Sequence, residues 1–237
     1  MVITGAARGL GRALAIIAAD RGANLVLLGR NESALELVAD ATEARTGSRA
    51  ACLPCDLGNP ASITAACRQT LAAAPVVDIL VNNAAPWLPG DLEDLADADI
   101  AATVAAALTG TMLVTKGLLP GLRRSAAADI VTIISTAGLP GRDASASTVF
   151  RAAKRGQSGF SDRLHEELKR YGIRVAAIYP PDFDDTDPLG PGWDEIRDPG
   201  LGAKLTNREV VAAIMFAITA PRVCSYPSIV LGNMFPE

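Results

Sequence analysis

The sequence predicts one α/β domain in which helices cover both faces of a parallel β-sheet. Short runs rich in β-branched and other apolar residues alternate with longer Ala- and Leu-rich segments of helical period along the 237 residues, and this alternation is typical of parallel sheets. The short runs are almost wholly apolar, as strands covered on both faces should be. No linker, repeat or low-complexity block divides the chain, so we expect a single domain over residues 1–237.

Seven strands and six long helices are expected in order along the chain. The strand runs cover residues 2–4, 24–28, 50–54, 78–81, 129–134, 173–179 and 228–231. The helical segments between them cover residues 10–21, 32–46, 60–73, 98–124, 148–171 and 207–219. Buried strands commonly have about five residues, so the first strand is either minimal or trimmed at its N-terminus.

Composition and charge argue against several classes of partner. The formal net charge is −4, and basic residues gather only in short pairs such as Arg123-Arg124, which argues against nucleic-acid binding. No apolar run reaches the roughly 18 residues of a membrane span, and no secretion signal opens the chain, so we expect a cytoplasmic protein. Cys52 and Cys55 have the spacing of half a metal site, but the chain has no second such pair and one histidine, so we expect free thiols and no metal.

A glycine-rich turn follows the first strand, with the sequence Thr4-Gly5-Ala6-Ala7-Arg8-Gly9-Leu10-Gly11. Gly5 permits a tight turn, whereas Gly9 and Gly11 let the backbone approach a pyrophosphate and let the next helix pack on the sheet. The N-terminus of that helix offers free N–H donors and the positive end of a dipole. Spaced glycines also occur in plain strand–helix turns, but their place directly after the first strand favours a dinucleotide site.

This turn resembles the TGxxxGxG turn of the short-chain dehydrogenase/reductase family, and further segments resemble family motifs in the same order. They are Cys55-Asp56-Leu57, Asn82-Asn83-Ala84-Ala85, Ile133-Ile134-Ser135, Phe150 through Lys154 with the helix that follows, and Pro180-Pro181. Ala85 and Pro181 stand where the family has glycine. The resemblance covers essentially the whole chain and implies a Rossmann-type, doubly wound parallel sheet of about seven strands. It also implies a homodimer or homotetramer formed through helices 98–124 and 148–171.

The end of the second strand bears on the choice of cofactor. It reads Leu28-Gly29-Arg30, without the acid that binds both ribose hydroxyls of NAD in dinucleotide folds. Arg30 suits the 2′-phosphate of NADP, and Arg8 adds a second cation, so the resemblance implies that NADP(H) is favoured over NAD(H). Arg30 also fits a helix cap or a solvent-exposed position.

The resemblance assigns the remaining cofactor contacts residue by residue. The full set is Gly5, Arg8, Gly9, Leu10, Gly11, Arg30, Asp56, Leu57, Asn82, Asn83, Ala84, Lys154 and Pro180. Asp56 fits an adenine contact but also a turn with Asn59-Pro60. Asn82 and Asn83 also fit ties between buried backbone groups of neighbouring strands.

The catalytic positions are only half filled. The family's reaction moves a hydride between a nicotinamide and a carbonyl or alcohol carbon, while a tyrosine moves the proton of the substrate oxygen. A lysine one helical turn later lowers the tyrosine pKa and holds the ribose, a serine binds the substrate oxygen, and an asparagine completes a proton relay. By resemblance, Ser135 and Lys154 fill two of these positions, whereas Phe150 replaces the tyrosine and Ala107 the asparagine. A phenyl ring has no proton to give, so we expect impaired hydride transfer on a small carbonyl or alcohol substrate.

Three explanations of Phe150 stay open at this point. It is an introduced substitution, a natural feature of a binding-only relative, or part of altered chemistry in which substrate or water supplies the proton. The second explanation describes an alternative function, a catalytically silent NADP(H)-binding sensor or assembly protein. By resemblance, Tyr179 at the end of the sixth strand lies near the expected nicotinamide position, but no lysine follows it one turn later.

An acidic loop follows the sixth predicted strand, at about residues 182–205. It carries Asp182, Asp184, Asp185 and Asp187 within six residues. By resemblance this loop is a lid over the substrate. Its charge fits either a cationic substrate or a solvated loop.

Overall fold

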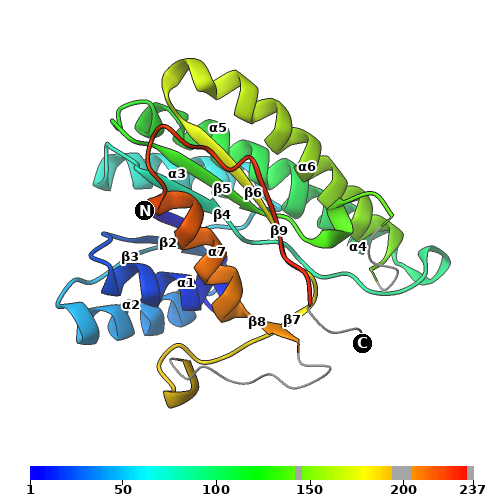
Figure 1. Ribbon diagram of the computed structural model, residues 1–237. Helices are drawn as coiled ribbons and strands as arrows, with labels where there is room; N and C mark the ends of the chain where they lie inside the picture. The colour runs from blue at the N-terminus through cyan, green and yellow to red at the C-terminus, as the bar shows by residue number, and fades with distance from the viewer. Residues whose placement is uncertain (142–145, 194–203, 234–237) are drawn as a thin grey trace.

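The computed structural model describes residues 1–141, 146–193 and 204–233. Seven strands form one parallel sheet in the order β3-β2-β1-β4-β5-β6-β9 (Figure 1). They are β1 (Val2–Thr4), β2 (Val26–Gly29), β3 (Ala51–Pro54), β4 (Ile79–Asn82), β5 (Asp129–Ile133), β6 (Arg174–Tyr179) and β9 (Ser228–Val230). The helices are α1 (Gly9–Asp20), α2 (Glu32–Thr46), α3 (Pro60–Ala73), α4 (Asp97–Val104), α5 (Gly110–Leu122), α6 (Thr148–Leu168) and α7 (Asn207–Thr219).

The sheet is doubly wound, as predicted. Strand order runs from β1 outward to β3 and then restarts at β4 on the other side of β1, which places the topological switch point between β1 and β4. Two hydrophobic clusters cover the two faces. One lies under α1, α2 and α7 and includes Leu14, Leu35 and Ile214, and the other lies under α3, α5 and α6 and includes Ile63 and Leu118. Figure 1 shows these two helix layers on opposite sides of the strands.

Polar side chains fix the starts of the helices that frame the carboxyl edge of the sheet. Asn31 accepts a hydrogen bond from Ala34 N at the start of α2, and Asn59 accepts two at the start of α3. Ser147 caps α6 by accepting from Phe150 N. Because such caps satisfy N–H groups that the helix itself cannot, they set the residue at which each helix begins.

The predicted helix 98–124 is interrupted. It consists of α4, a π-helical turn over Ala105–Thr109, and α5. The predicted helix 148–171 is α6 followed by a 3₁₀ turn over Lys169–Tyr171. A second, two-stranded sheet of β7 (Phe183–Asp184) and β8 (Leu205–Thr206) was not predicted, since two-residue strands leave no pattern in the sequence.

The same interrupted helix corrects one expectation about membranes. By length and composition alone, the 26-residue segment Asp97–Leu122 is apolar enough to cross a membrane. The prediction that no segment qualifies was therefore wrong, because it considered uninterrupted apolar runs. The finding is weak evidence, since core helices of soluble proteins pass the same test, and α5 packs on α3 while α4 packs on α6. The structure contains one chain, so the expected homo-oligomer stays a prediction. The cytoplasmic location likewise stays a prediction.

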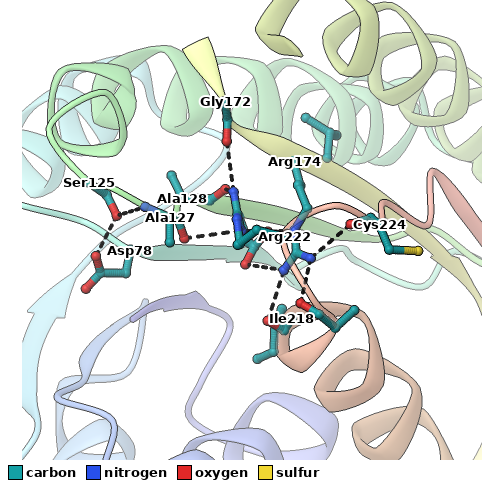
Figure 2. Close-up of polar contacts among 12 residues, drawn as sticks. Asp78, Ser125, Ala127, Ala128, Gly172, Arg174, Ile218, Arg222 and Cys224 are labelled. Carbon is teal, nitrogen blue, oxygen red and sulfur yellow. Dashed lines mark hydrogen bonds and ion pairs between the residues drawn. The ribbon is translucent and has the colours of Figure 1, made fainter.

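A buried ion-pair network ties the amino end of the sheet to the last crossover. Arg174, at the start of β6, donates from Nε and Nη2 to the Asp129 carboxylate at 2.7 and 3.0 Å, and Arg222 Nη1 donates to the same carboxylate at 3.0 Å. Figure 2 shows both guanidinium groups reaching backbone carbonyls from several segments. Arg174 binds the carbonyls of Ile218 and Cys224, and Arg222 those of Ala128 and Gly172. The network therefore fastens the segment between α7 and β9 to the sheet.

Candidate active site

The predicted site residues gather at one edge of the sheet. Because the strands are parallel, their carboxyl ends share this edge. The residues that follow β1 to β6 in turn are Gly5, Arg30, Asp56, Asn83, Ser135 and Pro180. The chain thus converges on the place where doubly wound sheets bind their ligands.

The glycine-rich turn is packed so closely that side chains are excluded. Gly5 and Gly9 have φ values of 66° and 53°, a left-handed conformation that glycine adopts without steric cost. A Cβ atom on Gly11 would lie 2.2 Å from the Gly5 carbonyl oxygen. The turn passes into α1, which begins at Gly9, has no acidic residue in its first turn and receives no side-chain cap from Arg8.

Thr4 and Asn83 clamp this turn to the end of β4. Thr4 Oγ1 accepts hydrogen bonds from Asn83 N at 2.9 Å and Ala84 N at 3.1 Å, and Asn83 Nδ2 donates to the Thr4 carbonyl at 2.9 Å. Asn82 donates to Thr115 Oγ1, while its buried Oδ1 has no hydrogen-bond partner in the described structure. Bracing of backbone groups, one of the two predicted roles of these asparagines, is therefore confirmed for Asn83.

Arg8, within the turn, and Arg30, directly after β2, are both exposed. Neither guanidinium forms a hydrogen bond or ion pair within the described residues. Asp56 Oδ1 accepts from Gly58 N at 2.9 Å, so Asp56 shapes the turn before α3, and Leu57 is half-buried beside it. The described residues contain no group of three or more His, Cys, Asp or Glu side chains placed to hold a metal ion.

Ser135 has a strained backbone. Its φ is 133° with ψ 153°, a region that is essentially restricted to glycine and costs on the order of 1–3 kcal/mol elsewhere. Hydrogen bonds on both sides hold this conformation, from Ile134 N to the Ile178 carbonyl and from Thr136 N to the Pro180 carbonyl. The strain turns the chain from β5 into a 3₁₀ turn over Thr136–Gly138, which packs against α6.

Phe150 and Lys154 lie one turn apart on α6, facing the Ser135 segment. The Phe150 ring packs on Ala137 and meets Trp87 edge-on, with ring centroids 4.8 Å apart. Lys154 Nζ lies 5.5 Å from the centre of the Phe150 ring and donates to the Ile133 carbonyl at 3.1 Å. Burial lowers the pKa of Lys154 to about 7, since desolvation disfavours the charged amine.

This pKa has a consequence for stability. Between pH 7 and the ordinary lysine pKa near 10.4, the unfolded chain binds a proton that the folded chain has released, so the free energy of unfolding rises with pH. We expect wild-type protein to gain stability between about pH 6.5 and about pH 8.5, and the Lys154→Met variant to gain measurably less. Urea denaturation of both proteins at both pH values measures the difference. Equal pH dependence in the two proteins would contradict a buried, largely neutral Lys154.

At Ala107, the residue in the asparagine position of the family, the backbone carbonyl accepts hydrogen bonds from two side chains. Gln157 Nε2, on α6, donates to the Ala107 carbonyl at 2.7 Å and to Thr111 Oγ1 at 2.9 Å, and Thr111 Oγ1 donates to the same carbonyl. Gln157 is buried, and its Oε1 has no partner among the described residues. Gln157 therefore links the π-helical turn to the helix of Lys154, a contact that the sequence analysis missed.

The nearby hydroxyl groups are already engaged. Tyr179 is buried, shares a hydrogen bond of 2.9 Å with Ser158, and has its pKa raised mainly by burial. Ser147 Oγ donates to the Leu88 carbonyl and accepts from Phe150 N. Both hydroxyls are therefore held by hydrogen bonds to neighbouring groups.

The acidic loop lies on the glycine-rich turn. Asp187 forms an ion pair of 2.8 Å with Arg12 of α1, and Asp185 Oδ2 would lie 3.1 Å from a Cβ atom on Gly9. The residues 194–203 of the predicted lid lie outside the described residues. The sequence analysis noted the acidic charge but missed these contacts, because residues such as Arg12 and Asp187, 175 positions apart, share no local pattern.

Known proteins are similar to this chain in sequence and fold. The family model for short chain dehydrogenases matches residues 1–194. The (2S)-[(R)-hydroxy(phenyl)methyl]succinyl-CoA dehydrogenase subunit BbsD of Thauera aromatica is 33% identical over 197 residues, which cover 83% of this chain and 76% of that protein. Ketoacyl reductase HetN of Nostoc sp. is 29% identical over 219 residues, covering 92% of this chain and 74% of that protein. A metagenomic short-chain oxidoreductase solved in complex with NADP has a TM-score of 0.80 and 26% identity, over 97% of this chain and 94% of that chain.

Proposed function

Because the chain belongs to the short-chain dehydrogenase/reductase family of oxidoreductases, we propose that it binds NADP(H) in preference to NAD(H) and interconverts a small carbonyl compound and its alcohol. Phe150 impairs this reaction by removing its proton donor. One observation carries the proposal: Ser135 and Lys154 come from packed, facing segments at the same edge of the sheet as the glycine-rich turn.

The residues at this edge fit a dinucleotide. A Cβ atom on Gly11 would lie 2.2 Å from the Gly5 carbonyl oxygen, and a dinucleotide turn requires its third glycine for this close packing of helix on strand. Arg8 and Arg30 are exposed cations beside the turn, suited to a 2′-phosphate. The unpartnered Asn82 Oδ1 is a buried acceptor for a ribose hydroxyl or an ordered water. The related NADP complex at 26% identity supports the same choice of cofactor.

The chemistry then depends on how this chain handles a proton. NADP(H), when bound, supplies or accepts the hydride. The Ser135 hydroxyl donates a hydrogen bond to the substrate oxygen, and the strained backbone at this residue fixes the direction of the hydroxyl. Lys154, whose pKa is about 7, is partly protonated near neutral pH and exchanges a proton with water in the space that a phenol would fill. The detour through water makes proton transfer slow.

The names of the relatives and the Trp87–Phe150 ring pair support the proposed substrate class. The relatives' names describe a dehydrogenase and a ketoacyl reductase, which supports a carbonyl–alcohol pair. Trp87 is 56% exposed and packs on Phe150, so an apolar substrate group has a surface to contact next to the reacting oxygen.

Nucleotide titration tests the cofactor assignment. We expect NADPH to bind roughly tenfold or more tightly than NADH, because a charge-assisted hydrogen bond contributes about 1.5–3 kcal/mol. Arg30→Ala should remove most of that preference by weakening NADPH binding and leaving NADH binding almost unchanged. Arg21→Ala, at the exposed far end of α1, is the matched control and should change neither. Equal affinities for the two nucleotides would refute the preference, and binding of neither would refute the proposed function.

A further inference from the structure

The Asp185 carboxylate lies at the part of the glycine-rich turn that binds the cofactor pyrophosphate in dinucleotide folds. In dinucleotide folds the pyrophosphate sits at the N-terminus of the first helix, next to the second glycine of the turn. Gly9 is that glycine and begins α1. The Asp185 carboxylate faces it, with Oδ2 and Oδ1 at 3.1 and 3.4 Å from the position of a Gly9 Cβ atom. The carboxylate and a bound pyrophosphate would therefore compete for one place.

Asn207, strand β8 and Arg12 together hold Asp185 and its neighbours in this position. The buried Asn207, the first residue of α7, donates to Asp185 Oδ1 at 3.4 Å, donates to the Thr186 carbonyl at 3.1 Å and accepts from Thr186 N at 3.0 Å. On one side, β7 pairs Phe183 and Asp184 with β8. On the other side, Asp187 pairs with Arg12, which directly follows Gly11 on α1. Residues 182–187, here named the acidic strap, are thus fastened across the turn at both ends.

The acidic strap also places negative charge at the positive, N-terminal end of α1. The first turn of α1 contains no acid, and Arg8 gives it no side-chain cap, so its positive end is left to the Asp185 carboxylate. Negative charge is stabilising at this end of a helix. The same interaction that stabilises the ligand-free turn opposes a second anion, since two like charges in one cradle repel each other.

We propose that Asp185 acts as a built-in competitor of the cofactor pyrophosphate, and that the acidic strap thereby sets the affinity of this site for NADP(H). The inference rests on the proposed function and adds the control of that site. Cofactor binding requires the Asp185 carboxylate to leave Gly9, whereas Asp182 and Asp184, on the same strap, make no described contact with the turn. One side chain, and not the overall charge of the loop, determines the affinity.

The test compares two variants that lose the same charge. Asp185→Asn keeps the shape of the side chain and removes its charge at the turn, and Asp184→Asn removes the charge of the neighbouring residue, which is exposed like Asp185. Fluorescence titration with NADPH gives a dissociation constant for each protein. We expect Asp185→Asn to bind NADPH roughly tenfold or more tightly than wild type, and Asp184→Asn to stay within about twofold. Thermal unfolding of the ligand-free proteins checks that both variants remain folded.

The outcomes separate this inference from the proposed function. If wild type and Asp185→Asn bind NADPH equally tightly, the competitor role is wrong and the proposed function stands. If both variants gain affinity equally, the effect is that of general charge, and the specific role of Asp185 is likewise overturned. If no protein in the series binds NADPH, both proposals fail, because the Asp185→Asn cradle should then be the most receptive of all.

Discussion

Replacing Phe150 by tyrosine is expected to raise the rate of NADPH-dependent carbonyl reduction by about 10²–10⁴-fold, the range that general acid–base catalysis typically contributes. The amine of Lys154 lies 5.5 Å from the centre of the Phe150 ring, so a hydroxyl group on that ring would enter the neighbourhood of an amine that is partly protonated near neutral pH. A nearby positive charge lowers the pKa of a phenol and prepares it to move a proton near neutral pH. The measurement is kcat for NADPH oxidation over a panel of ketones, aldehydes and ketoacyl thioesters.

Two controls make this result specific. The Phe150→Tyr/Lys154→Met double variant should lose most of the gain, because the phenol then has no cation to lower its pKa. Tyr179→Phe should leave turnover of the single variant unchanged, since that hydroxyl is bound to Ser158. If Phe150→Tyr binds NADPH yet stays inert on every carbonyl tested, the site is incomplete beyond the phenol, and a protein that only binds NADP(H) becomes the better description.

The Asp129→Ala variant is expected to lose about 3–5 kcal/mol of unfolding free energy, the cost of breaking a buried ion pair by removing one partner. The Asp129 and Arg174 side chains are 8% and 10% exposed, and loss of the carboxylate leaves Arg174 charged, buried and without an acid. For a chain of this length, each kcal/mol corresponds to a shift of about 2–4 °C in Tm. Guanidinium or thermal denaturation measures the loss.

An exposed pair on the same molecule provides the matched control. Arg45 binds Asp20 with the same two-bond geometry, at 2.8 and 2.6 Å, but the Asp20 and Arg45 side chains are 26% and 41% exposed. Asp20→Ala should therefore cost about 1 kcal/mol or less. A similar loss in both variants would mean that burial of the Asp129 network contributes nothing beyond its hydrogen bonds.

The layout of the sheet could be predicted because its signals are local. Apolar runs that alternate with helical segments predicted all seven strands and their order of appearance, and Gly5, Gly9 and Gly11 marked the turn because glycine is needed wherever backbone approaches backbone. Ser135, Lys154 and Phe150 were assigned by resemblance to the family and not by local pattern, and in the structure they lie on facing segments at the carboxyl edge. The π-helical turn escaped prediction because Ala105–Thr109 has the composition of an ordinary helix.

Contacts between distant segments could not be predicted in this way. The hydrogen bond from Gln157 to the Ala107 carbonyl and the approach of Asp185 to Gly9 join residues with no common periodicity. The acidic loop shows the limit well. Its charge was evident from the sequence, but charge alone fitted a substrate lid or a solvated loop, and only the three-dimensional arrangement places Asp185 on the cofactor turn.

The number of residues in the π-helical turn between α4 and α5 determines how the two helices are rotated relative to each other. Relative to an α-helix, a π-helical turn holds one extra residue, and one residue corresponds to a rotation of about 100° about the helix axis. That rotation lets α4 face α6 while α5 faces α3. Deleting any one residue of Ala105–Thr109 would turn α4 away from α6, whereas exchanging the exposed Thr109 side chain would not. During the divergence of such a chain, this stretch would therefore tolerate substitutions but not insertions or deletions.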